Sequence, residues 1–278
     1  MSLRSRRPPH RTALSLLALL PAWLLLAAGP ALAQPLGCGA VVTSSVTLAA
    51  DLLDCPGDGL VVGASGITVD LNGHTISGQI ISGGSPDQVG IDNSGGHDGV
   101  TIRNGTIRYF DRGGVHLVGV DRNRVQDLTM ELFGEFGILL EGGGSANRFT
   151  GNALEAPGTV GIGIFGVTAA SRDNLITGNL VDGGNTANIA LRYGTITGTR
   201  IEGNTSNRGD SEDDWGAAIT VGARYTIGEG DLRGTVVRGN RMDNNFSGGV
   251  FVSDSARDTL VERNHVDNSF GLPAFESD

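Results

Sequence analysis

The sequence predicts an all-β fold in which short parallel strands wind into a solenoid, and three observations lead to this prediction. Glycine makes up 45 of the 278 residues, whereas only 5% of the residues are aromatic and 18% are charged. Glycine at this density weakens helices and favours turns. In addition, two short motifs recur along the chain with a common period. A chain of this length can form one large domain from such repeats.

The first motif is an asparagine between two short apolar runs, as in LITGNLV at 175–181. Its copies are 27, 25, 36 and 24 residues apart, at Asn152, Asn179, Asn204, Asn240 and Asn264. An asparagine at the same corner of successive coils can take the left-handed backbone conformation and hydrogen-bond to its neighbours. We therefore expect a structural ladder here.

The second motif is a small residue followed by two apolar residues that flank a variable one, as in Gly114-Val115-His116-Leu117. The first apolar residue recurs every 23 to 31 residues, at Ile91, Val115, Ile138, Ile162, Ile189, Ile219 and Val250. These runs are too short and too rich in glycine for helical repeats, and they lack the spaced leucines of leucine-rich repeats. A coil of parallel strands fits best, with alternate residues pointing inward and coils about 4.8 Å apart.

The segment ITVDLNGHTISG at 67–78 illustrates one coil. Its first three apolar residues alternate inward, and Asn72-Gly73 then provides the corner. His74 follows the corner, and we interpret it as a structural residue bonded to nearby backbone. A single histidine without a partner nearby in the sequence is weak evidence for catalysis.

The first 33 residues have the three-part pattern of a cleaved signal peptide. Four arginines precede an apolar run that ends in Ala31-Leu32-Ala33. The run is short for a membrane anchor, which is the alternative reading. We expect cleavage after Ala33, a secreted or periplasmic protein, and no stable membrane span after cleavage.

The charge of the chain limits its partners. Residues 1–33 hold four of the 20 basic residues and none of the 30 acidic ones, so the mature chain has a net charge of −14. Nucleic acid is therefore not an expected partner. All basic residues are arginine, which excludes a lysine base or a lysine Schiff base.

The two cysteines, Cys38 and Cys55, are predicted to form a disulfide in an oxidising compartment. A metal site is the alternative, but no histidine lies between or beside them. The predicted organisation is a signal peptide at 1–33, an N-terminal cap with the disulfide at 34–66, β-helix coils at 67–272 and a tail at 273–278.

The segments CGAVVTSSVTLAADLLDC at 38–55 and GLVVGASGITVDLNGHTISG at 59–78, followed by Gly-Asn coils, resemble a known group of proteins. They are similar to secreted bacterial right-handed parallel β-helix proteins of the pectin-lyase-like group, including the repeats of the copper-accessory β-helix proteins of nitrous-oxide reductase systems. The resemblance implies a single-stranded right-handed parallel β-helix with a disulfide-stapled N-terminal cap. It leaves the function open, because the group includes lyases, hydrolases, epimerases, adhesins and scaffolds.

No complete catalytic motif of that group is present. Asp213-Asp214 matches the aspartate pair of polygalacturonases, but their Gly-His-Gly and Arg-Ile-Lys motifs are missing. Two hypotheses therefore stay open. The first is an exported protein that binds or processes an extracellular or envelope polysaccharide on one face of the solenoid. The second is a noncatalytic envelope scaffold or adhesin.

An acidic loop at 206–216 is the first candidate site, with four carboxylates beside Trp215: Asp210, Glu212, Asp213 and Asp214. Such a cluster can bind Ca²⁺, and Trp215 can stack on a sugar ring. The spacing matches no calcium-loop signature, so a solvated acidic loop is the favoured reading.

The second candidate site is an outward strip on the strands of the second motif. Alternation exposes Asp92, His116, Glu141 and, two coils further, Arg192. Neighbouring coils are close enough for Asp92 to orient His116 and for Glu141 to stand nearby, which could serve acid–base chemistry on a bound sugar. Phe165 would provide an apolar platform between Glu141 and Arg192. The alternative is a solvated sheet face without a catalytic role.

Overall fold

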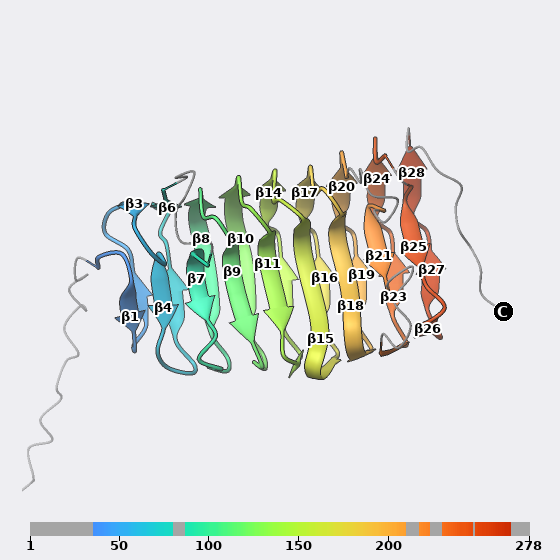
Figure 1. Ribbon diagram of the computed structural model, residues 1–278, viewed down its shortest axis with the longest axis horizontal. Helices are drawn as coiled ribbons and strands as arrows, with labels where there is room; N and C mark the ends of the chain where they lie inside the picture. Colours follow the sequence, from blue (N-terminus) through green and yellow to red (C-terminus); the bar gives the residue numbers. More distant parts are fainter. Residues whose placement is uncertain (1–35, 80–86, 210–216, 223–229, 247, 268–278) are drawn as a thin grey trace, which may run out of the picture. The chain divides into compact units, whose positions relative to one another are not determined.

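The computed structural model describes residues 36–79, 87–209, 217–222, 230–246 and 248–267. Strands follow one another in chain order along a stack of coils within the unit Ala33–Asp278 (Figure 1). These residues form one 12-stranded and one 16-stranded sheet, and they contain no helix. The predicted all-β solenoid is thus confirmed. Nowhere in these ranges is a helix long and apolar enough to cross a membrane.

The main path of sheet A, the 12-stranded sheet, takes one strand from each coil, and its strands pair in parallel. Its main path contains β1 (Ala40–Val42), β4 (Leu60–Val62), β7 (Val89–Asn93), β9 (Gly113–Val118), β11 (Phe136–Glu141), β15 (Val160–Arg172), β18 (Ala187–Thr197), β21 (Ile219–Val221) and β25 (Val250–Val252). Three short strands lie off this path: β12 (Gly144–Ser145), β22 (Asp231–Arg233) and β26 (Ala256–Arg257).

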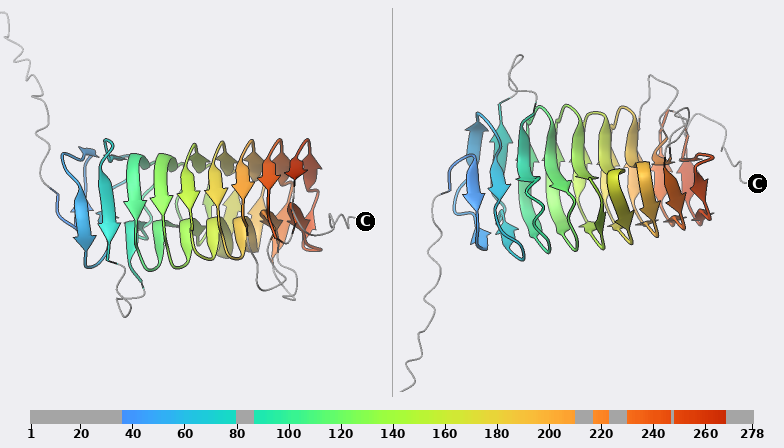
Figure 2. Two further views of the ribbon diagram at one scale, coloured as in Figure 1. Left: turned by 90° about the horizontal axis from the view of Figure 1, so that it is seen from above. Right: turned by 60° about the horizontal axis from the view of Figure 1, so that its bottom comes forward.

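Sheet B, the 16-stranded sheet, forms the other side of the coils. Turned views of the molecule show strands on opposite sides of the stack (Figure 2). One arm contains β2 (Val46–Thr47), β5 (Thr68–Asp70), β13 (Arg148–Thr150), β16 (Leu175–Thr177), β19 (Arg200–Glu202), β23 (Val236–Arg238) and β27 (Leu260–Glu262). The other arm contains β3 (Leu52–Cys55), β6 (Thr75–Gly78), β14 (Ala153–Glu155), β17 (Leu180–Asp182), β20 (Thr205–Asn207), β24 (Arg241–Asp243) and β28 (His265–Asp267). β8 (Thr101–Arg108) and β10 (Arg124–Glu131) run through both arms.

The core is a continuous column of apolar side chains between the sheets. The inward residues predicted from the second motif, Ile91 to Ile219, are fully buried, and Val250 in the last of these coils is partly buried. Each coil contributes residues from both sheets, so every coil covers the apolar surface of its neighbours. Burial of this surface is the main favourable term in folding.

The predicted asparagine ladder is present along sheet B. Each backbone N–H donates to the side-chain oxygen of the next asparagine, for example 3.0 Å from Asn152 to Asn179 and 2.9 Å from Asn179 to Asn204. Each side-chain amide also donates to its neighbour and to a backbone carbonyl of the previous coil, as Asn179 does to Phe149. The side chains from Asn152 to Asn240 are buried, and Asn264 at the end of the ladder is partly buried.

The expectation that these asparagines take the left-handed conformation is wrong. The residue before each asparagine has the positive φ: 66° at Gly151, 65° at Gly178, 63° at Gly203, 62° at Gly239 and 55° at Arg263. Glycine takes this conformation without a steric penalty. The left-handed residue turns the corner, and the asparagine behind it points its amide into the coil.

A second ladder, which the sequence analysis did not identify, begins at Asn123. The N–H of Asn123 donates to Asn147 over 2.8 Å, and that of Asn147 donates to Asn174 over 2.9 Å. Threonines continue this column, at Thr199 and Thr235. The hydroxyls of both are buried and have no hydrogen-bond partner within the described ranges.

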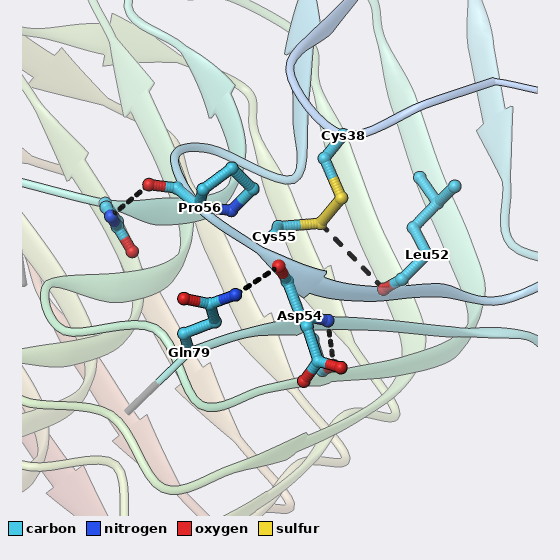
Figure 3. The surroundings of a disulfide bond; sticks show 8 residues. Cys38, Leu52, Asp54, Cys55, Pro56 and Gln79 are labelled. Carbon is cyan, nitrogen blue, oxygen red and sulfur yellow. Dashed lines mark hydrogen bonds between the residues drawn. A yellow bond between two sulfur atoms is a disulfide. The ribbon is translucent and has the colours of Figure 1, made fainter. Parts of the chain in front are cut away.

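The predicted disulfide joins Cys38 to Cys55, with 5.3 Å between the Cα atoms (Figure 3). Asp54, next to Cys55, accepts a 2.9 Å hydrogen bond at its carbonyl from Gln79 of the following coil. β1 to β3 pair in parallel with β4 to β6. The disulfide-linked segment is therefore itself a coil, and parallel pairing begins at Ala40, before the predicted start of the coils at residue 67.

His74 lies at the predicted corner, where Asn72 and Gly73 have φ values of 53° and 81°. Its Nδ1 lies 2.9 Å from a carboxylate oxygen of Asp51 in the previous coil. The side chain thus pairs with a carboxylate, whereas the sequence predicted a bond to backbone. The backbone N–H of His74 donates to Leu71.

Candidate active site

The outer face of sheet A brings three of the predicted site residues together. β7 and β9 pair with Asp92 opposite His116, and β9 pairs with β11 so that Leu139 lies opposite His116. Glu141 is two residues beyond Leu139, on the same face of β11. The register inferred from the second motif therefore places His116 between the two carboxylates.

Both ring nitrogens of His116 face a carboxylate. Nδ1 lies 3.3 Å from Oδ1 of Asp92, and Nε2 lies 2.8 Å from Oε1 of Glu141. Ser94 donates its hydroxyl to Oδ2 of Asp92 over 2.6 Å and its N–H to Oδ1 over 3.1 Å. The imidazole is thus fixed from both sides, with its Nε2 within hydrogen-bond distance of Glu141.

Solvent reaches the three side chains unequally. The exposed fraction is 6% for His116, 15% for Asp92 and 29% for Glu141. The expectation that His116 is exposed is therefore wrong, although it does point away from the core. The ring of Phe136 packs 5.8 Å from the His116 ring. Glu141 is the member of the group that an external ligand can reach most easily.

A small apolar cluster surrounds His116 on this outer face. Val89, Phe136 and Leu139 are buried there, and Phe165 packs against them. All four lie outside the core column. His116 and its carboxylates are therefore in a partly desolvated setting, where electrostatic interactions are stronger than in water.

Arg112, which the sequence analysis missed, lies beside this group. Its Nη2 is 3.6 Å from Oε1 of Glu141, its Nε is 3.7 Å from Oε2 of Glu135, and its guanidinium lies 5.7 Å from the centre of the Phe136 ring. The turn before β9 places Arg112, and the turn before β11 places Glu135. Arg112 is thus the cation nearest to Glu141 among the described residues.

The surroundings of two aspartates near this face shift their pKa values in opposite directions. Burial opposes ionisation of Asp92, but hydrogen bonds from His116 and Ser94 outweigh it and hold the pKa of Asp92 below its ordinary value. Burial raises the pKa of Asp58, and the charge of Asp92 acts in the same direction. The Asp58 carboxylate accepts a 2.9 Å hydrogen bond from the N–H of Val89. Asp58 was also missed from the sequence.

Comparing turn positions between repeats would have found Arg112. The residues just before the strands of sheet A contact one another across coils, as the N–H of Glu135 donates to the carbonyl of Arg112. An arginine and a glutamate in neighbouring coils at this position give a charge pattern in the sequence. The second motif does not include this turn position, so it did not identify Arg112.

Phe165 and Arg192 occupy the places predicted for them. Glu141 pairs with Phe165 in β15, and Phe165 pairs with Arg192 in β18. Arg192 is therefore two coils from Glu141 and does not contact the His116 group. The structure does not test the roles predicted for these residues.

The other predicted site residues, Asp210, Glu212, Asp213, Asp214 and Trp215, lie outside the described residues. The described ranges contain one group that could hold a metal ion: Asp243, His265 and Asp267, whose ligand atoms lie within 4.8 Å of one another. Arg241 already pairs with Asp243. A cation at this place would compete with the guanidinium.

Several solved structures are similar to this chain, and one of them, with a TM-score above 0.5, supports the fold. One is the surface protein and adhesin PfbA of Streptococcus pneumoniae, with 13% identity, a TM-score of 0.52, and coverage of 84% of this chain and 89% of that chain. Another is DFA-IIIase from Arthrobacter chlorophenolicus A6 in complex with GF2, with 16% identity, a TM-score of 0.48, and coverage of 80% and 70%. An alginate lyase from Paenibacillus has 15% identity, a TM-score of 0.42, and coverage of 82% and 98%. At such identities the likeness concerns the fold alone.

No curated protein sequence matches the chain. The family described as right handed beta helix region matches residues 51–206, which is more than half of the sequence. This match covers the disulfide-linked coil from Asp51 onward, the asparagine ladder up to Asn204 and the face that carries His116. The chain therefore belongs to the right-handed β-helix family.

Proposed function

We propose that this protein binds a polysaccharide along the outer face of sheet A and processes it by acid–base chemistry at Glu141. One observation supports this most strongly: a histidine held between two carboxylates, of which Glu141 is the more accessible. Proton transfer to or from a sugar needs an acid or base side chain that the sugar can reach. Glu141 meets both conditions.

The three side chains take different roles in this proposal. Glu141 contacts the sugar and donates or accepts the proton. His116 is a positioning residue, because its ring is almost fully covered and acts on the sugar through Glu141. Asp92 fixes the orientation of the imidazole through Nδ1. Arg112 lies beside the Glu141 carboxyl group and helps to hold it in place.

We also infer that the protein acts outside the cytoplasm. The disulfide supports this, because such bonds persist in oxidising compartments. The predicted signal peptide at 1–33 lies outside the described residues and stays a prediction. Detection of mature protein beginning at Gln34 in the periplasm or medium would test it.

Glu141→Gln is the variant that tests the proposed chemistry. We expect it to lower turnover by roughly 10²- to 10⁴-fold, since the amide cannot transfer the proton, while the thermal midpoint changes little. Neutral and uronic-acid polysaccharides should be screened, with readouts for new reducing ends, unsaturated products and epimerised sugars. Screening with and without Ca²⁺ also tests the predicted acidic loop.

Glu135→Gln is the matched control, because Glu135 also pairs with Arg112 but does not contact His116. We expect this variant to retain turnover. Equal loss in both variants, or full activity of Glu141→Gln, would contradict the assignment of Glu141.

The second candidate function is a noncatalytic envelope scaffold or adhesin. The buried, fully paired His116 favours it, because the same contacts would tie three coils together without any chemistry. This alternative predicts no turnover of any polysaccharide, and it predicts that Glu141→Gln lowers stability rather than activity.

A further inference from the structure

Among the described residues, Arg192 is a partly buried cation without a counter-charge. Neighbouring Leu191 points into the core, so Arg192 points outward from β18. Across the described residues its guanidinium makes no ion pair, and its Nε is buried without a hydrogen-bond partner. Arg112 on the same face, by contrast, contacts two glutamates. A partly buried charge without a counter-charge is costly, and an anionic group of a ligand on the accessible part of the guanidinium would offset this cost.

An aromatic pair stands beside Arg192. Phe165 lies opposite it in the neighbouring coil, and the ring of Tyr193 meets the Phe165 ring edge-on, with 5.4 Å between centres and 86° between planes. Tyr193 is 37% exposed. Aromatic faces of this kind pack well against the apolar faces of sugars.

The backbone fixes the position of Tyr193. Its φ of 61° is uncommon for a residue with a large side chain. The next residue, Gly194, has a φ of 58°, and a Cβ there would lie 1.5 Å from the carbonyl oxygen of Gly166. The pairing of β15 and β18 shifts register at this corner. The left-handed pair Tyr193-Gly194 therefore turns the strand at this corner and sets the place of the Tyr193 side chain.

We propose that Arg192, Phe165 and Tyr193 form a subsite for a uronic-acid residue, with the sugar carboxylate on the guanidinium. The planar guanidinium matches a carboxylate through two parallel N–H donors, which its two terminal nitrogens Nη1 and Nη2 provide. The sugar ring packs against the aromatic pair. This inference rests on the proposed function, because it concerns the same polymer.

The charges on the outer face of sheet A determine where along it a sugar carboxylate is favoured. Asp92 and Glu141 are acidic and disfavour a second carboxylate close to them, whereas Arg192 favours one. Two coil spacings of about 4.8 Å separate Glu141 from Arg192, so they are about 10 Å apart along the stack. One sugar residue extends such a polymer by about one coil spacing, so Arg192 holds a sugar about two residues from the one at Glu141, and it sets which linkage lies at Glu141.

The test compares acidic polymers with their neutral forms. Polygalacturonate and alginate are each measured beside the same polymer with its carboxyl groups reduced to alcohols. We expect wild-type protein to bind at least one acidic polymer roughly 10- to 100-fold more tightly than its reduced form. Arg192→Gln should remove this preference. Arg148→Gln should keep it, since Arg148 is an exposed arginine on sheet B without an ion pair among the described residues.

Equal binding of acidic and reduced polymers by wild type, or an unchanged preference in Arg192→Gln, would overturn the subsite. Absence of binding to both acidic polymers would overturn it as well. The proposed function is judged separately: turnover of any polymer that is lost in Glu141→Gln upholds the function at Glu141 even when Arg192→Gln has no effect.

Discussion

Asparagine suits the inner corner of a coil because one amide carries both a donor and an acceptor. At Asn179 the side-chain oxygen accepts from the N–H of Asn152, while the amide nitrogen donates to Asn204 and to the carbonyl of Phe149. The carboxylate of an aspartate would lack the donor. An apolar side chain would leave buried backbone groups of two coils without partners.

Replacement of Asn179 by leucine should therefore lower the free energy of unfolding by about 1–3 kcal/mol. The matched control is Asn185→Leu, because Asn185 is exposed and its side chain makes no hydrogen bond within the described part of the chain. Urea denaturation of both variants measures the difference. A similar midpoint shift in the two variants would mean that the ladder contributes little.

The threonines of the second ladder allow a prediction of the opposite sign. The Thr199 hydroxyl is buried without a partner, so Thr199→Val should raise the free energy of unfolding by about 1 kcal/mol. Thr177→Val is the control, because the Thr177 hydroxyl donates to the carbonyl of Glu202 over 2.8 Å. That variant should be less stable than wild type. Thermal denaturation distinguishes them, and destabilisation by Thr199→Val would contradict the assignment.

Asp58 and Asp92 should respond to pH with opposite signs. The pKa of Asp58 is raised in the folded state, so its charge destabilises the fold at neutral pH, and this cost disappears as pH falls through the raised pKa. The pKa of Asp92 is lowered, so its charge stabilises the fold above the unfolded value of about 3.9, and this contribution is lost as pH falls toward the lowered pKa.

Asp58→Asn should therefore be more stable than wild type at pH 7, and Asp92→Asn should be less stable. Both differences should shrink as the pH is lowered. The asparagine at position 58 can still accept the hydrogen bond from Val89. Chemical denaturation between about pH 2 and pH 7 measures both effects, because the Asp58 difference changes above the unfolded value of about 3.9 and the Asp92 difference changes below it. Differences that do not change with pH would show that charge is not their cause.

At the scale of the strand, side-chain alternation was enough to predict part of the site. The recurring apolar pairs fix the register, because a slip by one residue would turn every apolar side chain outward. Asp92, His116 and Glu141 could therefore be assigned to one face from the sequence. The burial of His116 could not, because it depends on Phe136 and Leu139, which reach across from the next coil.

The turns between strands were harder to predict. Arg112 and Asp58 precede strands, where the alternation does not yet apply, and the turn conformation decides where their side chains point. The left-handed residue of each ladder corner was misplaced by one position for the same reason. A glycine and an asparagine in sequence both tolerate positive φ, so composition alone does not decide between them.

At the scale of the whole molecule, each coil contacts its two neighbours, and stability is close to a sum of coil and interface terms. The disulfide acts on one end of this array. The double variant Cys38→Ser/Cys55→Ser should lose about 2–4 kcal/mol, expressed as faster amide hydrogen exchange in β1 and β4. β15 should keep its protection. Two free thiols in protein purified from the periplasm or medium would contradict the bridge, and unchanged exchange in β1 would contradict its stabilising role.

The asparagine ladder also has a consequence for how this gene can change in length. The 36 residues between Asn204 and Asn240 keep the same 2.9 Å bond as the 25 between Asn179 and Asn204. A longer interval between two asparagines therefore does not disturb the ladder. A duplication of one whole repeat would bring its own asparagine, its own inward aliphatic residues and partners on both sides. Duplication or deletion of a repeat can thus lengthen or shorten this protein by one coil at a time. Natural variants that differ by complete repeats are expected to fold.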